Sequence, residues 1–248
     1  MGFFAKLFTK EEKLISADLS VLNTDIHSHF IPGIDDGSKS MEETLTLLKE
    51  FQDLGYKKVI TTPHIMSDLY RNTPEIILSG LDEVKKAKSE AGLTIEIEAA
   101  AEYYLDFEFE KLIEEKNLLT FGENFVLFEL PFVAPSPNIH SAIFKMQTSG
   151  YQPVLAHPER YSYWHHKFEN FYDLKEKGVL LQLNINSLSG HYSMETKKTA
   201  ERLIDENLID FFGSDCHNMN HVILTKRCLT EKHLHKIINY ENLLNKTL

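Results

Sequence analysis

The sequence has few cysteines, no excess of basic residues and no long apolar run. Its 248 residues include only two cysteines, too few for a framework of disulfide bonds. Acidic residues outnumber basic residues by 37 to 26, and the resulting net charge of −11 argues against a general nucleic-acid-binding protein. No stretch approaches the roughly 18 consecutive apolar residues that cross a membrane, so we expect no transmembrane segment.

The first residues also lack the features of a secretory signal peptide. Residues 1–8 are apolar and slightly basic, but they contain neither a long hydrophobic region nor a small-residue cleavage site. Together with the scarcity of cysteine, this predicts a location in the reducing cytoplasm. We interpret residues 1–20 as an N-terminal tail, with an interfacial turn as the alternative, and residues 21–248 as one domain.

Short apolar runs typical of β-strands alternate with amphipathic helices along the rest of the chain. The expected strands lie near residues 21–27, 57–62, 94–101, 125–130, 152–156, 179–184 and 208–213. Their continuous apolarity favours burial on both faces, as in a parallel sheet. One strand plus one helix repeats about every 30 residues, which matches a βα unit. Seven units predict a single α/β domain with a closed or nearly closed (β/α) barrel, and an open doubly wound sheet is the alternative.

Local signals mark the starts of several helices. Ser40 and Glu43 have the spacing of a capping box before one expected helix. Thr73 followed by Pro74 predicts the start of the next helix, because proline is favoured in the first turn. Asn138 is a candidate cap for a third helix.

Histidine is frequent, with 12 residues, and many histidines and acids fall where expected strands end. The charged residues that end or follow six of the seven strands are His27, His29, His64, Glu102, Glu129, His157, Arg160, Asp215 and His217. In a parallel barrel these strand ends converge on one face, where active sites are built. Side chains alternate along an extended segment, so Asp215 and His217 point the same way while Cys216 points aside.

This mixture of imidazoles and carboxylates predicts a metal site. Without cysteine ligands the set suits zinc, manganese or iron, and the residues alone do not choose among them. Some of these positions, taken singly, also fit a purely structural interpretation. His64 is also compatible with a loop histidine, and residues 35–37 (DDG) are typical of a turn. An unpaired Glu129 inside an apolar stretch would be costly, which favours a ligand role.

Several motifs occur in order along the chain. They are DIHSH at residues 25–29, DDG at 35–37, TPH at 62–64, AEYY at 101–104, HPERY at 157–161 and SDCHN at 214–218. Over about residues 22–245 this order resembles the PHP (polymerase and histidinol phosphatase) superfamily, and within it the bacterial tyrosine-protein phosphatases linked to capsular and exopolysaccharide synthesis. The resemblance implies a distorted, TIM-like barrel of seven βα units.

The resemblance also implies three divalent metal ions, with manganese expected and zinc or iron as alternatives. The implied ligands are His27, His29, Glu102 and Asp215 for one ion, Asp36, His64 and His217 for a second, and Glu102, Glu129 and His157 for a third. Glu102 would therefore bridge two ions. Arg160 matches an arginine that contacts the substrate phosphate.

One position departs from that branch, in which a second phosphate-contacting arginine follows the last Asp-x-His pair. Residues 218–222 read NMNHV here, and the candidates to replace it are His221, Lys226 and Arg227.

The implied activity is hydrolysis of phosphotyrosine on protein by metal-activated hydroxide. The expected partner is a membrane-associated tyrosine kinase, which would place the chain peripherally at the inner membrane. Two alternatives stay open. One is another PHP phosphoesterase with a small substrate such as histidinol phosphate, and the other is a non-catalytic phosphotyrosine-binding partner.

Overall fold

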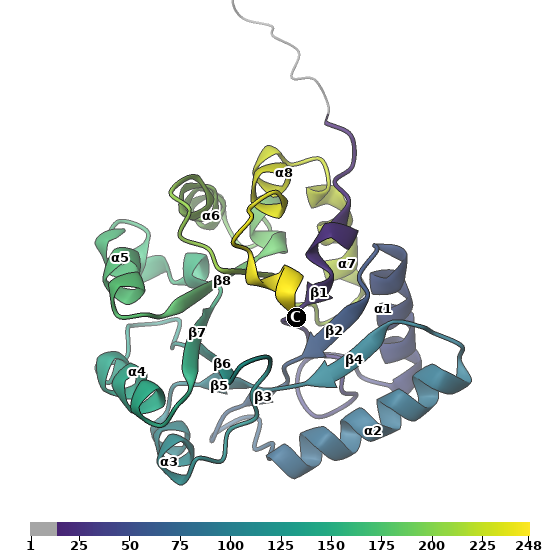
Figure 1. The fold of residues 1–248 in the computed structure, drawn as a ribbon, viewed down its shortest axis with the longest axis horizontal. Coiled ribbons are helices and arrows are strands. Elements are labelled where there is room, and N and C mark those ends of the chain that lie inside the picture. Colours follow the sequence, from purple (N-terminus) through teal and green to yellow (C-terminus); the bar gives the residue numbers. More distant parts are fainter. Residues whose placement is uncertain (1–13) are drawn as a thin grey trace, which may run out of the picture.

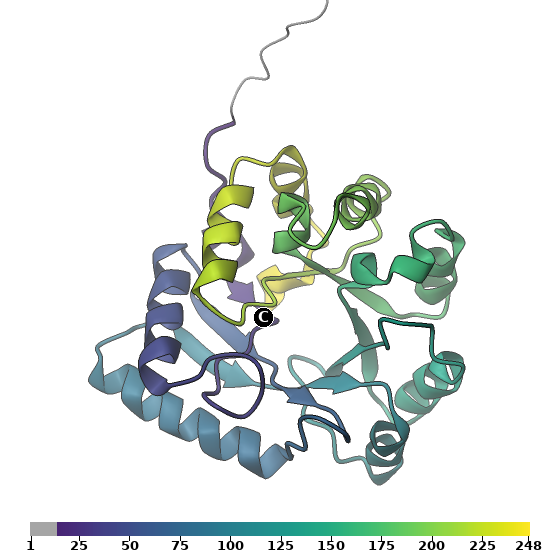
Figure 2. The same cartoon turned by 180° about the vertical axis from the view of Figure 1, so that it is seen from behind.

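The computed structural model describes residues 14–248, so the expected interfacial turn over residues 1–8 lies outside the described part. Strands surround a central axis and helices form an outer ring (Figure 1, Figure 2). The strands are β1 (Thr24–Asp25), β2 (Lys58–Thr61), β3 (His64–Ile65), β4 (Glu96–Ala99), β5 (Glu102–Tyr104), β6 (Phe125–Glu129), β7 (Gln152–Ala156), β8 (Leu180–Asn184) and β9 (Phe211–Gly213). The α-helices are α1 (Met41–Asp53), α2 (Pro74–Glu90), α3 (Phe107–Glu115), α4 (Ile139–Thr148), α5 (Glu169–Glu176), α6 (Met194–Asp205), α7 (Met219–Cys228) and α8 (Lys232–Ile238).

The strands pair in parallel in two sheets, with the orders β1-β2-β4 and β3-β5-β6-β7-β8-β9. The first sheet leads into the second because β2 is followed directly by β3 and β4 by β5. Pro63 lies between β2 and β3 and has no N–H to donate, although its carbonyl accepts from the Glu102 N–H at 3.1 Å. A parallel bridge between Ser28 and Cys216 joins the segments after β1 and β9. The predicted distorted barrel in a single α/β domain is confirmed, and its distortion is the division into two sheets.

Alternation along the strands separates a barrel interior from an outer layer. In β6, Leu127 packs in the interior cluster, whereas Val126 and Phe128 pack in the larger core beneath the helices. Phe211, the first residue of β9, also lies in the interior cluster, with Phe125 of β6 against it. Apolar side chains therefore close the amino end of the barrel.

The helix starts follow the expected caps with one exception. Ser40 Oγ accepts from the Glu43 N–H at 3.2 Å, and Thr73 Oγ1 accepts from the N–H of Ile76 at 3.4 Å. Asn138 precedes α4 but makes no cap bond, because its side-chain amide donates to Glu110 Oε1 at 3.0 Å instead.

The first expected strand, over residues 21–27, is mostly replaced by other structure. A 3₁₀ turn, η1 (Leu19–Leu22), precedes a β1 of two residues. Asp18 Oδ1 accepts from the Ser20 N–H at 2.9 Å and caps this turn. Asn23 follows with a positive φ of 64°, which delays the extended backbone. Within the tail expected over residues 1–20, Leu19 is buried.

Candidate metal centre

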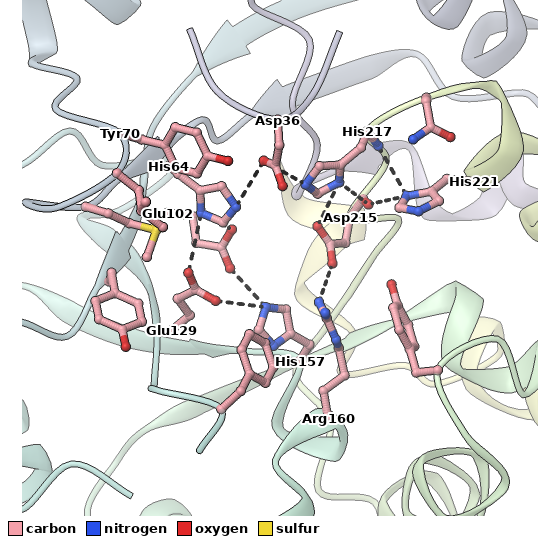
Figure 3. A pocket seen from close by; sticks show the side chains of 16 residues that line it. Asp36, His64, Tyr70, Glu102, Glu129, His157, Arg160, Asp215, His217 and His221 are labelled. Carbon is pink, nitrogen blue, oxygen red and sulfur yellow. Dashed lines mark hydrogen bonds and ion pairs between the residues drawn. The ribbon is translucent and has the colours of Figure 1, made fainter. Parts of the chain in front are cut away.

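A cavity of about 470 Å³ opens at the carboxyl ends of the strands (Figure 3). The predicted site residues that line it are Asp36, His64, Glu102, Glu129, His157, Arg160, Asp215, His217 and His221. The other two, His27 and His29, are fully buried beside it, with their Nε2 atoms 3.0 and 3.5 Å from Glu102 Oε2. The barrel thus brings all eleven predicted residues to one end.

Their ligand atoms form three overlapping groups, each with its atoms within 4.8 Å of one another. The groups are His27, His29, Glu102 and Asp215; His29, Asp36, His64 and His217; and His64, Glu102 and Glu129. The first holds the four residues that the resemblance assigns to one ion, and the second contains the trio assigned to another. His157, expected in the third set, has Nε2 3.0 Å from Glu102 Oε1 and 3.7 Å from Glu129 Oε2.

Glu102 belongs to two of the three groups and also faces His157. Its Oε2 lies 3.0 Å from His27 Nε2 and 3.2 Å from His64 Nδ1, while its Oε1 faces His157. Glu102 begins β5 and is fully buried. A carboxylate with both oxygens surrounded by imidazoles has the geometry of a bridging ligand.

Buried groups without partners provide a test of whether metal ions fit. Within residues 14–248, His29 Nε2, His64 Nδ1 and His157 Nδ1 are buried and make no hydrogen bond. Burial, followed by repulsion from Glu102, raises the pKa of Glu129 well above its usual range. Cations would satisfy unpaired nitrogens and separate the crowded carboxylates, so the donor set fits metal ions.

Two imidazoles of this cluster, those of His157 and His64, favour the neutral form that binds metal. Burial, and then the nearby Arg160 charge, lowers the pKa of His157 to about 4. Burial likewise lowers the pKa of His64. Both side chains are therefore neutral at physiological pH, as a metal ligand must be.

Two residues outside the predicted set orient its histidines. Asp35 Oδ2 lies 2.8 Å from His29 Nδ1, and Gln182 Oε1 lies 2.8 Å from His27 Nδ1. Such partners fix the ring orientation of metal-binding histidines. Sequence reasoning treated Asp35 as part of a turn and passed over Gln182. A polar residue between Leu181 and Leu183 in a buried strand was the available signal.

Arg160 reaches the cluster from the 3₁₀ turn after β7. Its Nη1 donates to Asp215 Oδ2 at 2.9 Å, as the dashed line in Figure 3 shows. His221 lies in α7 with its Nδ1 3.0 Å from the carbonyl oxygen of Asp215. Lys226 instead pairs with Glu50, and Arg227 is exposed on the same helix away from the cavity lining. Among the three candidates for the missing arginine, His221 alone lines the cavity.

Cys216 lies apart from the ligand atoms. It is fully buried and packs in the hydrophobic core outside the strands, where its Sγ is 3.6 Å from the Asn218 carbonyl oxygen. Burial raises the pKa of its thiol well above the usual range. Cys216 therefore has neither the position nor the ionisation of a nucleophile.

In the part of the chain from residue 14 onward, no helix has the length and apolarity needed to cross a membrane.

Comparison with known proteins identifies relatives along most of the chain. The family described as capsular polysaccharide synthesis, CpsB/CapC, matches residues 23–233. Tyrosine-protein phosphatase YwqE of Bacillus subtilis is 29% identical over 196 residues, covering 79% of this chain and 77% of that protein. Tyrosine-protein phosphatase CpsB of Streptococcus agalactiae is 28% identical over 202 residues, covering 79% and 83%.

Solved structures agree with this assignment. The fold is similar, with a TM-score of 0.78 and 27% identity, to a chain from a study of YwqE from Bacillus subtilis and CpsB from Streptococcus pneumoniae, described there as metal-dependent tyrosine phosphatases. The match covers 90% of this chain and 94% of the other. An amidohydrolase from Mycoplasma synoviae shares the fold at a TM-score of 0.52. The chain belongs to the CpsB/CapC family of capsular polysaccharide synthesis proteins.

Proposed function

We propose that this chain is a metal-dependent phosphatase that hydrolyses phosphotyrosine on proteins. One observation carries the proposal: three overlapping groups of imidazoles and carboxylates, two of which share Glu102, meet Arg160 at one open cavity. Family membership and the names of the relatives support it. The buried thiol of Cys216 favours a metal-dependent route over a cysteine nucleophile.

We propose three divalent cations, with manganese preferred and zinc or iron as alternatives. The residues that would hold them are His27, His29, Glu102 and Asp215; Asp36, His64 and His217; and Glu102, Glu129 and His157. When bound, such cations polarise phosphoryl oxygens and lower the pKa of water towards neutrality. Because the ligand set contains only four carboxylates, it leaves a cation-loaded cavity net positive in a chain with a net charge of −11.

Arg160 binds the phosphoryl group in this proposal. One nitrogen of its guanidinium is held by Asp215, and the planar fork has further N–H donors for phosphoryl oxygens. Negative charge is spread over those oxygens in the transition state, so a donor already in place stabilises it. A tyrosine phenolate has a pKa near 10 and leaves with less need of a proton than an alkoxide.

We propose that His221 contacts the phosphoryl group in place of the second arginine, which is absent from residues 218–222. Its Nδ1 faces the Asp215 carbonyl, so its Nε2 is the atom available to a phosphoryl oxygen. Nε2 donates only when it carries a proton, and a bound phosphate dianion would favour that state.

Side chains around the cavity suit an aromatic substrate. Tyr70, Tyr104 and Phe132 line it, so a phenyl ring could pack against them while its phosphate reaches Arg160. We further propose that the substrate is a tyrosine-rich tail of a membrane-associated kinase. This would place the chain in the cytoplasm, peripherally at the inner membrane, and the free Cys216 and Cys228 are compatible with a reducing compartment.

Rates on two substrates test the proposal. Protein loaded with manganese should hydrolyse a phosphotyrosine peptide with a higher kcat/KM than histidinol phosphate. Faster turnover of histidinol phosphate would identify a small-substrate phosphoesterase instead. Tight binding of the peptide without release of phosphate would identify a non-catalytic partner.

A further inference from the structure

The guanidinium of Arg160 lies between two aromatic rings. Its Cζ is 4.3 Å from the ring centroid of Tyr192 and 4.8 Å from that of Phe132. Phe132 follows β6, and Tyr192 follows the 3₁₀ turn η4 (Ile185–Ser189) after β8. Residues from two separate loops of the barrel thus meet on the same cation, and both line the cavity.

These contacts restrict how Arg160 can turn. A guanidinium over an aromatic face is held by attraction to the ring, and the attraction strengthens where water is excluded. The Arg160 side chain is only 23% exposed. Tyr192 and Phe132 stack on the guanidinium while Asp215 accepts from Nη1, which leaves the remaining N–H groups for the cavity.

The Tyr192 hydroxyl makes no hydrogen bond to Arg160 or Asp215. It is buried, and within residues 14–248 no group meets it with the distance and angle of a hydrogen bond. A buried hydroxyl without a partner costs free energy. What Tyr192 contributes to Arg160 is therefore its ring, and a phenylalanine would supply the same face.

We propose that Tyr192 and Phe132 are positioning residues that hold Arg160 in the orientation needed to bind a phosphoryl group. The need for them follows from the cavity lining, in which Arg160 is the one arginine among the described residues. One guanidinium must then supply the planar contact alone, and fixing it beforehand reduces the entropy lost on binding. This inference rests on the proposed function, because it names the device that prepares the same site.

A double-mutant cycle with Arg160 tests the proposal. Tyr192→Leu should lower kcat/KM on a phosphotyrosine peptide by about tenfold, the scale of a desolvated cation–π contact. Tyr192→Phe should stay within about twofold of the parent, because the ring is kept. In an Arg160→Lys background, Tyr192→Leu should have an effect of less than about twofold, since both changes act on one interaction.

Binding of inorganic phosphate gives a readout independent of turnover. Calorimetry should show weaker phosphate binding for Tyr192→Leu and parent-like binding for Tyr192→Phe. Metal content and melting temperature are measured for every variant, because Phe132 also stacks on His157 at 5.6 Å. Tyr172→Leu, at a tyrosine of α5 that is 40% exposed, is the matched control and should match the parent.

Two results would overturn the positioning role. One is a Tyr192→Leu effect that persists in full in the Arg160→Lys background, and the other is a Tyr192→Phe variant as impaired as Tyr192→Leu. If Tyr192→Leu does not fold, Phe132→Leu replaces it in the same cycle with the same expected coupling. A parent protein that binds phosphate but hydrolyses no phosphotyrosine peptide would refute the proposed function, while the phosphate-binding cycle would still decide the role of Tyr192.

Discussion

The two ends of the barrel interior have opposite chemistry. At the amino end, Phe211 packs edge-on against Phe121 and Phe125, with ring centroids 5.6 and 5.2 Å apart. At the carboxyl end, His29 and His64 keep buried nitrogens that make no hydrogen bond with the described residues. At the apolar end the side chains pack on one another. At the polar end the imidazole nitrogens fit cations, which the chain itself does not supply. We therefore expect substitutions at the amino end of the barrel to change stability and substitutions at the carboxyl end to change function.

The largest effect should come from the shared carboxylate of the polar end. Glu102→Ala removes the side chain that faces His27, His64 and His157, so it should lose at least two metal ions and nearly all turnover. Elemental analysis and peptide hydrolysis measure both. Glu90→Ala, at an exposed acid in α2, is the control. Full metal occupancy in Glu102→Ala would rule out the bridging role.

A substitution at the apolar end should lower stability and leave metal binding and turnover unchanged. Phe211→Ala opens a cavity in a fully buried cluster and should lower the free energy of unfolding by about 3–5 kcal/mol. Urea unfolding measures this loss, with Phe144→Ala at a 66% exposed position as the control. The folded fraction should keep its metals and its turnover. Loss of metal with unchanged stability would contradict the separation of the two ends.

Arg160→Lys should reduce turnover without loss of metal. Lysine keeps the charge but lacks the planar fork, and we expect a fall of about 10²-fold, as for the loss of one preorganised donor. His221→Ala should cost less, about tenfold, the value of one hydrogen bond to a charged group. Kinetics on a phosphotyrosine peptide compare the two. An Arg160→Lys variant equal to the parent would mean that the pocket serves another substrate.

The smallest effect is expected at Cys216, which lies next to the ligands in sequence but packs in the outer core. Cys216→Ser should retain most of the turnover. Iodoacetamide should not inhibit the parent, because burial raises the pKa of this thiol. Inhibition by alkylation with all metals retained would instead indicate a thiol mechanism.

The same comparison shows why the sequence predicted some features and missed others. Strands such as β6 and β7 are mostly apolar, and His157 follows one of them directly, so periodicity and chain order were sufficient. The shortness of β1 was not visible, because it depends on the η1 turn and on the positive φ of Asn23 within residues 21–27. Gln182 was missed because its role depends on which face of β8 it occupies beside His27.

Tyr192, a loop residue, also has a contact that the sequence did not predict. Its ring meets Arg160 only because the segments after β7 and β8 are neighbours in the barrel. Residue type and spacing along the chain carry no trace of that contact. Residues at strand ends that line the cavity were therefore easier to predict than residues that contact them from neighbouring loops.

Removal and return of metal test the central claim most directly. Purified protein is assayed on a phosphotyrosine peptide before EDTA treatment, after it, and after Mn²⁺ is added back, with metal content measured at each step. We predict that turnover falls to background with the loss of metal and returns with Mn²⁺. The packing around Phe211 at the apolar end should persist at every step. Full turnover in protein shown to be free of metal would contradict the proposed function.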